Sequence, residues 1–275
     1  MTNTQKRIFS ALILVILVLY TVYLGPEFAL GLVLILMIII NDEIFCNFFK
    51  KNRVTLSYFF SQLILVSAYI YLSYFSKDLY FNYMLIDLSL ALNMALLYYL
   101  FFVEMDSKSV VDFARKYSWI SGIFVLLSAT SMTIIFHYSK WKEFLAMLLF
   151  LTYGMDSGAW FFGKKYGKKK LWPDVSPNKT VEGLVGGAFT SAVLGGVFWF
   201  SLFSRINIRL FVFFMFLGVM SQIGDLIESK FKRQFDLKDS SSLIPGHGGV
   251  YDRLDSLLFL SPFYALVIWY FYLNP

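Results

Sequence analysis

The stretch IFSALILVILVLYTVYL, residues 8–24, carries no charged side chain and decides the class of fold. A helix needs roughly 20 apolar residues to cross the hydrocarbon core of a bilayer, and this stretch comes close to that length. It could be mistaken for a signal peptide, but it lacks a clear small-x-small cleavage site and runs within a few residues into another apolar segment. We therefore predict a membrane-spanning helix here.

The composition of the whole chain supports the same class of fold. Of its 275 residues, 58% are hydrophobic and only 15% are charged, and the mean hydropathy is +0.65. Soluble globular domains contain about 25% charged residues. We predict an all-α, polytopic integral membrane protein in one domain, residues 1–275. The same length criterion predicts nine spanning helices, at about 8–24, 27–41, 55–75, 79–103, 118–136, 143–162, 184–203, 208–227 and 257–272.

The distribution of lysine and arginine predicts the orientation, because cytoplasmic loops carry an excess of both. With the N-terminus inside and the C-terminus outside, all but five of the 24 basic residues fall on the cytoplasmic side. The five exceptions are Lys77, Lys140, Lys142, Arg205 and Arg209. Such a face favours anionic headgroups and phosphorylated ligands. For the loops before residue 120, however, the topology signal alone is a sufficient explanation.

Two long polar connections, about 163–183 and 228–256, lie on this same predicted side, so function is expected there. In the first, prolines and glycines indicate an ordered loop rather than a continuous helix. Ser176 and Lys179 suit phosphate or ribose binding, and Asp156 lies near the end of the preceding span, where an acid is costly unless it faces protein, water or a cation. A basic loop that only sets topology is the alternative.

The second connection is bounded by two pairs of acids with helical spacing. Asp225 and Glu228 stand three residues apart, as do Asp252 and Asp255, so each pair lies on one helix face. Asp239 adds a carboxylate between them. Carboxylates without cysteine partners are hard oxygen ligands that suit Mg²⁺, and neighbouring cations suit a polyphosphate. Those cations are Lys230, Lys232, Arg233, Lys238 and Arg253. Acids at a helix start also favour its dipole, which could explain one of them.

A glycine-rich loop surrounds His247 within this connection. Pro245, Gly246, Gly248 and Gly249 exclude regular helix, and the backbone N–H groups of such a loop can face an anion. We expect His247 to contact a phosphate group or the metal shell. A purely structural histidine is the alternative.

Residues 229–255 read S-x-F-K-R-x4-K-D-S-x2-L-I-P-G-H-G-G-V-x-D-R-L-D, which resembles the signature of the phosphatidate cytidylyltransferases, also called CDP-diacylglycerol synthases. Further stretches are similar to that family: the Asp-Ser-Gly-Ala run from Asp156 and the Ser-Pro-Asn-Lys-Thr run from Ser176. The resemblance is strong over about 150–262, the expected catalytic region, and generic over 1–140, the expected helical scaffold. Asn178 departs from the lysine that the family often has there.

The resemblance implies condensation of CTP with phosphatidic acid to CDP-diacylglycerol and pyrophosphate, by a dimeric, Mg²⁺-dependent membrane enzyme that binds no nucleic acid. It places the enzyme in the bacterial inner membrane with its active site facing the cytoplasm. It also implies that Asp225 and Asp252 are the principal metal ligands, with Asp239 and Asp255 as further ligands or as residues that orient the ligands. His247 and Arg253 complete the catalytic residues. The residues expected to hold nucleotide or lipid are Lys179, Ser176, Asp156, Lys232, Arg233 and Lys238.

Two other functions remain open at this point. A CTP-dependent lipid-alcohol kinase could use the same nucleotide and metal, but would transfer the γ-phosphate. A secondary transporter would place ionisable residues near mid-membrane, where Asp87 is the candidate. The chain has no G-x4-G-K-[ST] loop, which disfavours an ATPase pump.

Overall fold

The computed structural model describes residues 3–75, 79–205 and 207–273. Within these residues, nine helices are long and apolar enough to cross a membrane, which confirms an all-α, polytopic fold. The ten α-helices are α1 (Asn3–Leu24), α2 (Pro26–Glu43), α3 (Leu56–Ile70), α4 (Leu79–Phe102), α5 (Lys108–Lys116), α6 (Ile120–Thr133), α7 (Trp141–Tyr166), α8 (Val181–Phe203), α9 (Ile208–Gln234) and α10 (Tyr251–Ile268). Two antiparallel strands, β1 (Lys170–Trp172) and β2 (Ser176–Thr180), form the sheet.

Short irregular helical turns extend four of these helices. π-helical turns follow α2 at Ile44–Phe48, α3 at Tyr71–Phe75 and α10 at Trp269–Leu273, and a 3₁₀ turn follows α6 at Ile134–His137. They lengthen the apolar segments toward the size that a bilayer requires.

The ends of the spans differ from those predicted. α7 continues to Tyr166 and α9 to Gln234, and α10 begins at Tyr251 rather than near residue 257. A hydropathy criterion stops where polar residues begin, whereas these helices continue into polar sequence. The short helix α5 and the β1–β2 ribbon were not predicted, because neither is long and apolar.

The chain forms two compact units, and the first comprises residues 1–139 and 231–254. Within it α6 packs against α2, α3 and α4. A buried polar contact joins three of these helices: Asn41 Nδ2 donates to Ser61 Oγ at 3.0 Å, and Ser61 Oγ lies 3.0 Å from Ser121 Oγ. A Cβ at Gly122 would lie 2.3 Å from the Ser61 carbonyl oxygen, so α3 and α6 approach closely only because this residue is glycine.

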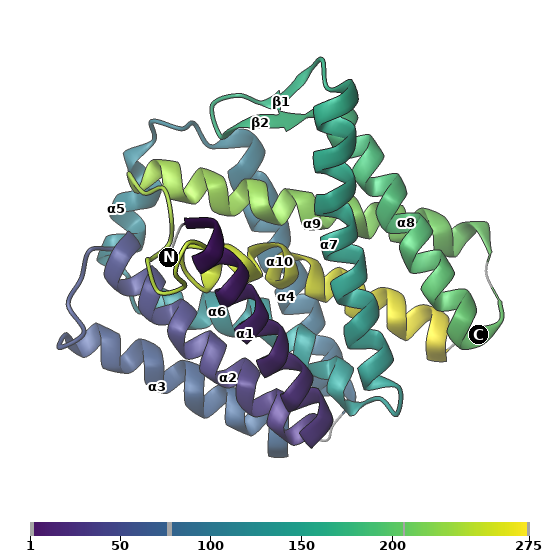
Figure 1. Ribbon diagram of the computed structural model, residues 1–275. Helices are drawn as coiled ribbons and strands as arrows, with labels where there is room; N and C mark the ends of the chain where they lie inside the picture. The colour runs from purple at the N-terminus through teal and green to yellow at the C-terminus, as the bar shows by residue number, and fades with distance from the viewer. Residues whose placement is uncertain (1–2, 76–78, 206, 274–275) are drawn as a thin grey trace. The chain divides into compact units, whose positions relative to one another are not determined.

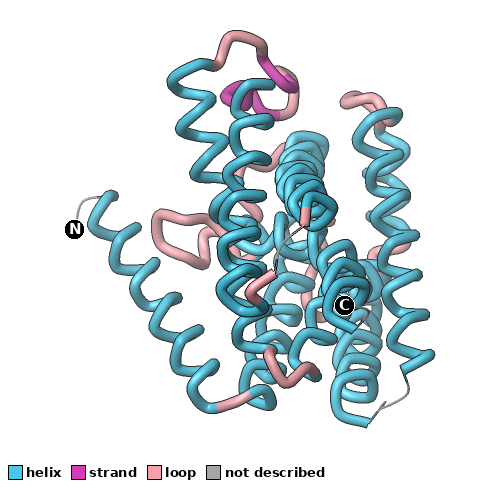
Figure 2. Tube along the Cα trace, turned by 90° about the vertical axis from the view of Figure 1, so that its right-hand side faces the viewer, coloured by secondary structure: helices cyan, strands magenta, loops and turns pink. Residues whose placement is uncertain are grey.

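The second unit comprises residues 140–230 and 255–275, and a hairpin of α7 and α8 dominates it. Small residues line the contact, because a Cβ at Gly158 would lie 2.5 Å from Thr190 Oγ1 and one at Gly187 would lie 2.7 Å from the Met155 carbonyl oxygen. Such small-residue contacts let membrane helices pack at short distance. Figure 2 shows the two strands, in magenta, at the end of this hairpin.

We expect Gly187→Ala to lower the free energy of unfolding by about 1–3 kcal/mol, as overpacking of a close-packed contact does. The matched control is Gly31→Ala, since a Cβ at Gly31 would meet no heavy atom within 4 Å. The control should leave stability unchanged or slightly raised, because alanine is the better helix former. Thermal unfolding in detergent measures both. A Gly187→Ala protein as stable as the control would contradict the close α7–α8 contact.

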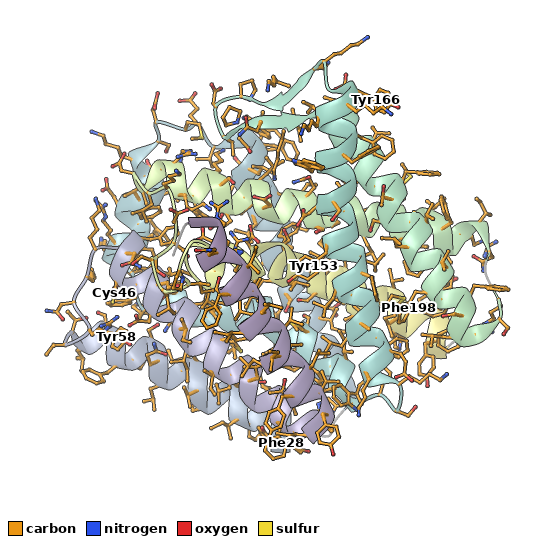
Figure 3. The ribbon with its side chains drawn as sticks, viewed as in Figure 1. Phe28, Cys46, Tyr58, Tyr153, Tyr166 and Phe198 are labelled. Carbon is orange, nitrogen blue, oxygen red and sulfur yellow. The ribbon has the colours of Figure 1, made fainter. Side chains whose placement is uncertain are left out.

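Much of the apolar surface is exposed within each unit, as expected of side chains that face lipid. On α1, Ile16 and Leu19 are 64% and 63% exposed. Figure 3 labels Phe28 at the start of α2 and Tyr153 on α7, both of which are exposed. These surfaces suit hydrocarbon, in agreement with the spans assigned above.

Candidate active site

Three carboxylates meet where α9 and α10 approach each other in the second unit. Asp225 and Glu228 come from α9 and Asp255 from α10, and one oxygen of each lies within 4.8 Å of the others. Gly224 permits this approach, since a Cβ there would lie 2.8 Å from Phe259 Cβ and 3.1 Å from the Asp255 carbonyl oxygen. The three-residue spacing predicted from sequence thus places Asp225 and Glu228 on the face that meets α10. We call these three residues the acidic trio.

The β1–β2 ribbon supplies a cation to the acidic trio. Lys179 on β2 donates from Nζ to Asp225 Oδ2 at 2.5 Å, and Ser229 Oγ donates to Asp225 Oδ1 at 3.2 Å. The next residue, Thr180, caps α8 by accepting the Gly183 N–H at 3.1 Å, which fixes the end of the strand that carries Lys179. The structure therefore brings together two residues predicted from sequence, Asp225 and Lys179.

The donor set of the acidic trio fits a divalent cation. Glu228 is only 1% exposed, and three carboxylates this close repel one another unless positive charge lies among them. Oxygen ligands of this kind suit Mg²⁺. Glu228 was paired with Asp225 by spacing but was not predicted as a ligand, and its burial is the feature that the sequence does not reveal.

Asp252 lies in the first unit and contacts the loop between α9 and α10. Its Oδ1 accepts from Lys232 Nζ at 2.8 Å, and its Oδ2 accepts the N–H groups of Ser240 and Gly249 at 2.8 and 2.7 Å. Its side chain is only 4% exposed. Asp252 therefore fixes both ends of the glycine-rich loop against α10, and Lys232 lies beside it as the sequence predicted.

A second buried carboxylate, which sequence reasoning missed, holds the same loop. Glu43, the last residue of α2, is 3% exposed and accepts the N–H groups of Val250 and Tyr251, both at 2.9 Å. Ser241 Oγ donates to it at 2.6 Å, and Ser240 Oγ lies 3.0 Å away. An acid at the end of an apolar span is the signal that could have found it.

The glycines of the loop have separate physical reasons. Gly246 and Gly248 have φ of 78° and 86°, which favours glycine. At Gly249 the reason is space, since a Cβ would lie 2.0 Å from Ser240 Oγ and 2.6 Å from Glu43 Oε1. The sequence indicated that N–H groups of this loop can face an anion. Those of Gly249 and Val250 instead face carboxylates of the chain itself.

His247 lies in the same loop with its Nδ1 2.7 Å from Ser10 Oγ of α1. Burial lowers the pKa of His247 below its usual value, and the positive charges of Arg253 and Arg7 lower it further. This lowering of the pKa favours the neutral imidazole, which carries no charge toward a phosphate group.

The other residues predicted from sequence are divided between the two units. Lys238, Asp239 and Arg253 line a cavity of about 650 Å³ in the first unit, and Arg233 is exposed in the last turn of α9. In the second unit, Ser176 begins β2, and Asp156 is exposed on α7, ten residues before the helix ends. Thus Asp225 and Asp255 are brought together in one unit, and Asp239 and Asp252 both adjoin Gly248 in the other.

Together, the fold and these sites define a class of protein: a polytopic helical membrane protein with carboxylate and lysine clusters suited to a cation and phosphate groups. The family model described as "Cytidylyltransferase family" matches residues 5–271, and the chain belongs to that family. The resemblance found in the sequence is confirmed.

Individual relatives agree with the family model. A protein from Bacillus subtilis (strain 168) named phosphatidate cytidylyltransferase is 42% identical over 151 residues, which cover 51% of this chain and 55% of that relative. Proteins of the same name from Staphylococcus haemolyticus (strain JCSC1435) and Staphylococcus saprophyticus are 37% and 38% identical, each over 56% of this chain and 62% of the relative. The matches thus span between half and two thirds of the length of these relatives.

Proposed function

We propose that this chain transfers the cytidylyl group of CTP to phosphatidic acid, giving CDP-diacylglycerol and pyrophosphate for phospholipid biosynthesis. The observation that carries the proposal is the acidic trio with Lys179 beside it, in a chain of the cytidylyltransferase family. The names of its relatives support the lipid acceptor.

The chemistry requires positioning and charge neutralisation rather than a strong base. The phosphate monoester of phosphatidic acid has a second pKa near 6, so it is largely a dianion at neutral pH. One of its oxygens attacks the α-phosphorus of CTP, a new P–O bond forms, and the bond to the β-phosphate breaks as pyrophosphate departs. The acidic trio with Lys179, a cluster of carboxylates and one cation, agrees with this requirement.

Asp225, Glu228 and Asp255 would hold Mg²⁺ through carboxylate oxygens in this proposal. When bound, the ion supplies charge that offsets the triphosphate and the departing pyrophosphate. Lys179 orients Asp225 and adds a positive charge of its own. That Asp252 is a principal ligand and Asp239 a further one, and that Lys232, Arg233 and Lys238 hold phosphate groups, stay predictions.

The products distinguish this function from its nearest rival. Purified protein is incubated with CTP, Mg²⁺ and phosphatidic acid, and in parallel with CTP, Mg²⁺ and diacylglycerol. Mass spectrometry should find CDP-diacylglycerol and pyrophosphate in the first reaction and no new lipid phosphate in the second. CDP together with a phosphorylated lipid in the second reaction would establish the kinase instead.

The proposal places the protein in the bacterial inner membrane as a homodimer, with the α7–β1 connection and the loop between α9 and α10 in the cytoplasm. Lys169→Cys and Ser242→Cys, each in a Cys46-free background, should resist membrane-impermeant thiol reagents in intact cells and react after permeabilisation. Both residues are exposed. Lys142→Cys, on the opposite predicted side, is the matched control and should react in intact cells. The reverse pattern would overturn the orientation and the access of cytosolic CTP.

A further inference from the structure

A basic cavity in the first unit contains none of the residues of the acidic trio. Its volume is about 650 Å³, and its charged lining is Arg7, Lys238, Arg253 and the single carboxylate Asp239. Three cations against one acid favour an anionic ligand. Arg7 comes from the start of α1, more than 200 residues before the loop that supplies the others. From sequence alone, the excess of basic residues in cytoplasmic loops is a sufficient reason for an arginine at position 7.

Polar contacts hold the start of α1 against the glycine-rich loop. Arg7 donates from Nε to the Gly246 carbonyl at 2.8 Å, and Ser10 Oγ donates to the Pro245 carbonyl at 3.2 Å and lies 2.7 Å from His247 Nδ1. Figure 1 shows this loop, in yellow-green, beside the first turns of α1. These contacts place Arg7 at the loop instead of leaving it free on the surface.

The two arginines of the cavity are oriented in the same way. Arg253 donates from Nε to the His247 carbonyl at 3.1 Å, just as Arg7 donates from Nε to the neighbouring Gly246 carbonyl. Bonding through Nε leaves the two terminal amino groups of each guanidinium, which form the fork that matches phosphate oxygens. The carbonyls of the neighbouring residues Gly246 and His247 thus hold two guanidinium groups at the same cavity.

Both arginines lie at the polar end of an apolar span. Arg7 begins the span Arg7–Leu24, and Arg253 lies in the first turn of the span Tyr251–Tyr272. Basic residues in such positions lie at the level of lipid headgroups. A phosphate group carried by a membrane lipid reaches that level without leaving the bilayer.

We propose that Arg7 and Arg253 clamp the phosphate monoester of the lipid substrate in this cavity. The inference rests on the proposed function, since it names the part of the chain that takes phosphatidic acid. The phosphates of CTP share the same chemistry, but the headgroup level of both arginines favours the lipid. Lys238 adds charge on the loop side of the cavity.

Arg7→Gln tests the clamp, because it keeps an amide donor but removes the charge and the fork. Because the substitution removes a charge-assisted contact to the phosphate group, the KM for phosphatidic acid should rise about 10-fold to 100-fold while the KM for CTP and kcat change little. Arg53→Gln is the matched control: Arg53 pairs with Asp42 and is 67% exposed. Its kinetics should resemble those of the wild type.

Binding of dioleoyl phosphatidic acid to the detergent-solubilised protein, followed by native mass spectrometry, separates this inference from the proposed function. Arg7→Gln should weaken that binding and spare binding of CTP. If the wild-type protein shows no cytidylyl transfer but this substitution still weakens lipid binding, the proposed function fails and the clamp stands. Unchanged lipid binding, or a loss confined to CTP, overturns it. Should Arg7→Gln fail to fold, Arg7→Lys keeps the charge without the fork and should give a smaller rise in the same KM.

Discussion

Asp225→Asn is expected to lower kcat/KM by at least a hundredfold while the protein still folds and inserts. The substitution keeps the size of the side chain but removes the charge that Lys179 contacts and that a metal ion would need. Losing one group that stabilises transition-state charge costs about 10²–10³ in kcat in comparable cases. Steady-state kinetics with CTP and phosphatidic acid, at saturating Mg²⁺, measure the loss.

Asp87→Asn is the control for this prediction. Asp87 is exposed on α4, in the other unit of the chain. The alternative function of a secondary transporter depends on this residue. We expect its kinetics to stay close to those of the wild type. Equal losses from Asp225→Asn and Asp87→Asn would point to a transport pathway or a general folding defect and would contradict a cytidylyl site at the acidic trio.

The second large effect is expected at Glu43, in the first unit. In the wild type, the Glu43 carboxylate accepts two backbone N–H groups and the Ser241 hydroxyl. Glu43→Gln replaces one of its oxygens with an amide nitrogen, which cannot accept from these donors. A buried donor left without an acceptor costs about 1–3 kcal/mol. We expect the loop at 240–251 to exchange its amide hydrogens faster and kcat/KM to fall at least tenfold, because this loop carries His247 and leads into Arg253. Hydrogen exchange and kinetics measure the two effects.

Asp42→Asn, one residue earlier on α2, is the matched control. Asp42 pairs with Arg53 at 2.7 Å, and the Arg53 side chain is 67% exposed, so the pair is expected to contribute about 0–1 kcal/mol. The control should leave hydrogen exchange of the loop unchanged. If both substitutions loosen the loop equally, the Glu43 contacts are not what holds it.

The sequence predicted the spans well because their signal is local. An apolar segment such as 8–24 identifies itself by length and composition, and the structure has a spanning helix there. Helical spacing also paired Asp225 with Glu228 correctly, since both lie on one helix. Helix α5 was missed because it is short and polar, and the criterion responds only to long apolar segments.

What could not be predicted depends on contacts between distant parts of the chain. In the sequence, Glu43 is recognisable only as an acid at the end of a span. The four groups that donate hydrogen bonds to it belong to residues about 200 positions later. The sequence predicts only that Arg7 helps to set the topology, whereas in the structure it donates a hydrogen bond to the Gly246 carbonyl. Asp252 was assigned by resemblance, and its bonds to Ser240 and Gly249 depend on a loop path that no local pattern encodes.

The fate of each phosphate of CTP tests the proposed cytidylyl transfer most directly. Purified protein, Mg²⁺ and phosphatidic acid are incubated with CTP carrying radioactive phosphorus at either the α- or the γ-position, and the lipid fraction is counted. We expect the α-label to enter the lipid and the γ-label to leave in water-soluble pyrophosphate, and we expect neither the labelled lipid nor labelled pyrophosphate to form when phosphatidic acid is omitted. Label from the γ-position in the lipid, or no label from either position at saturating substrates, would contradict it.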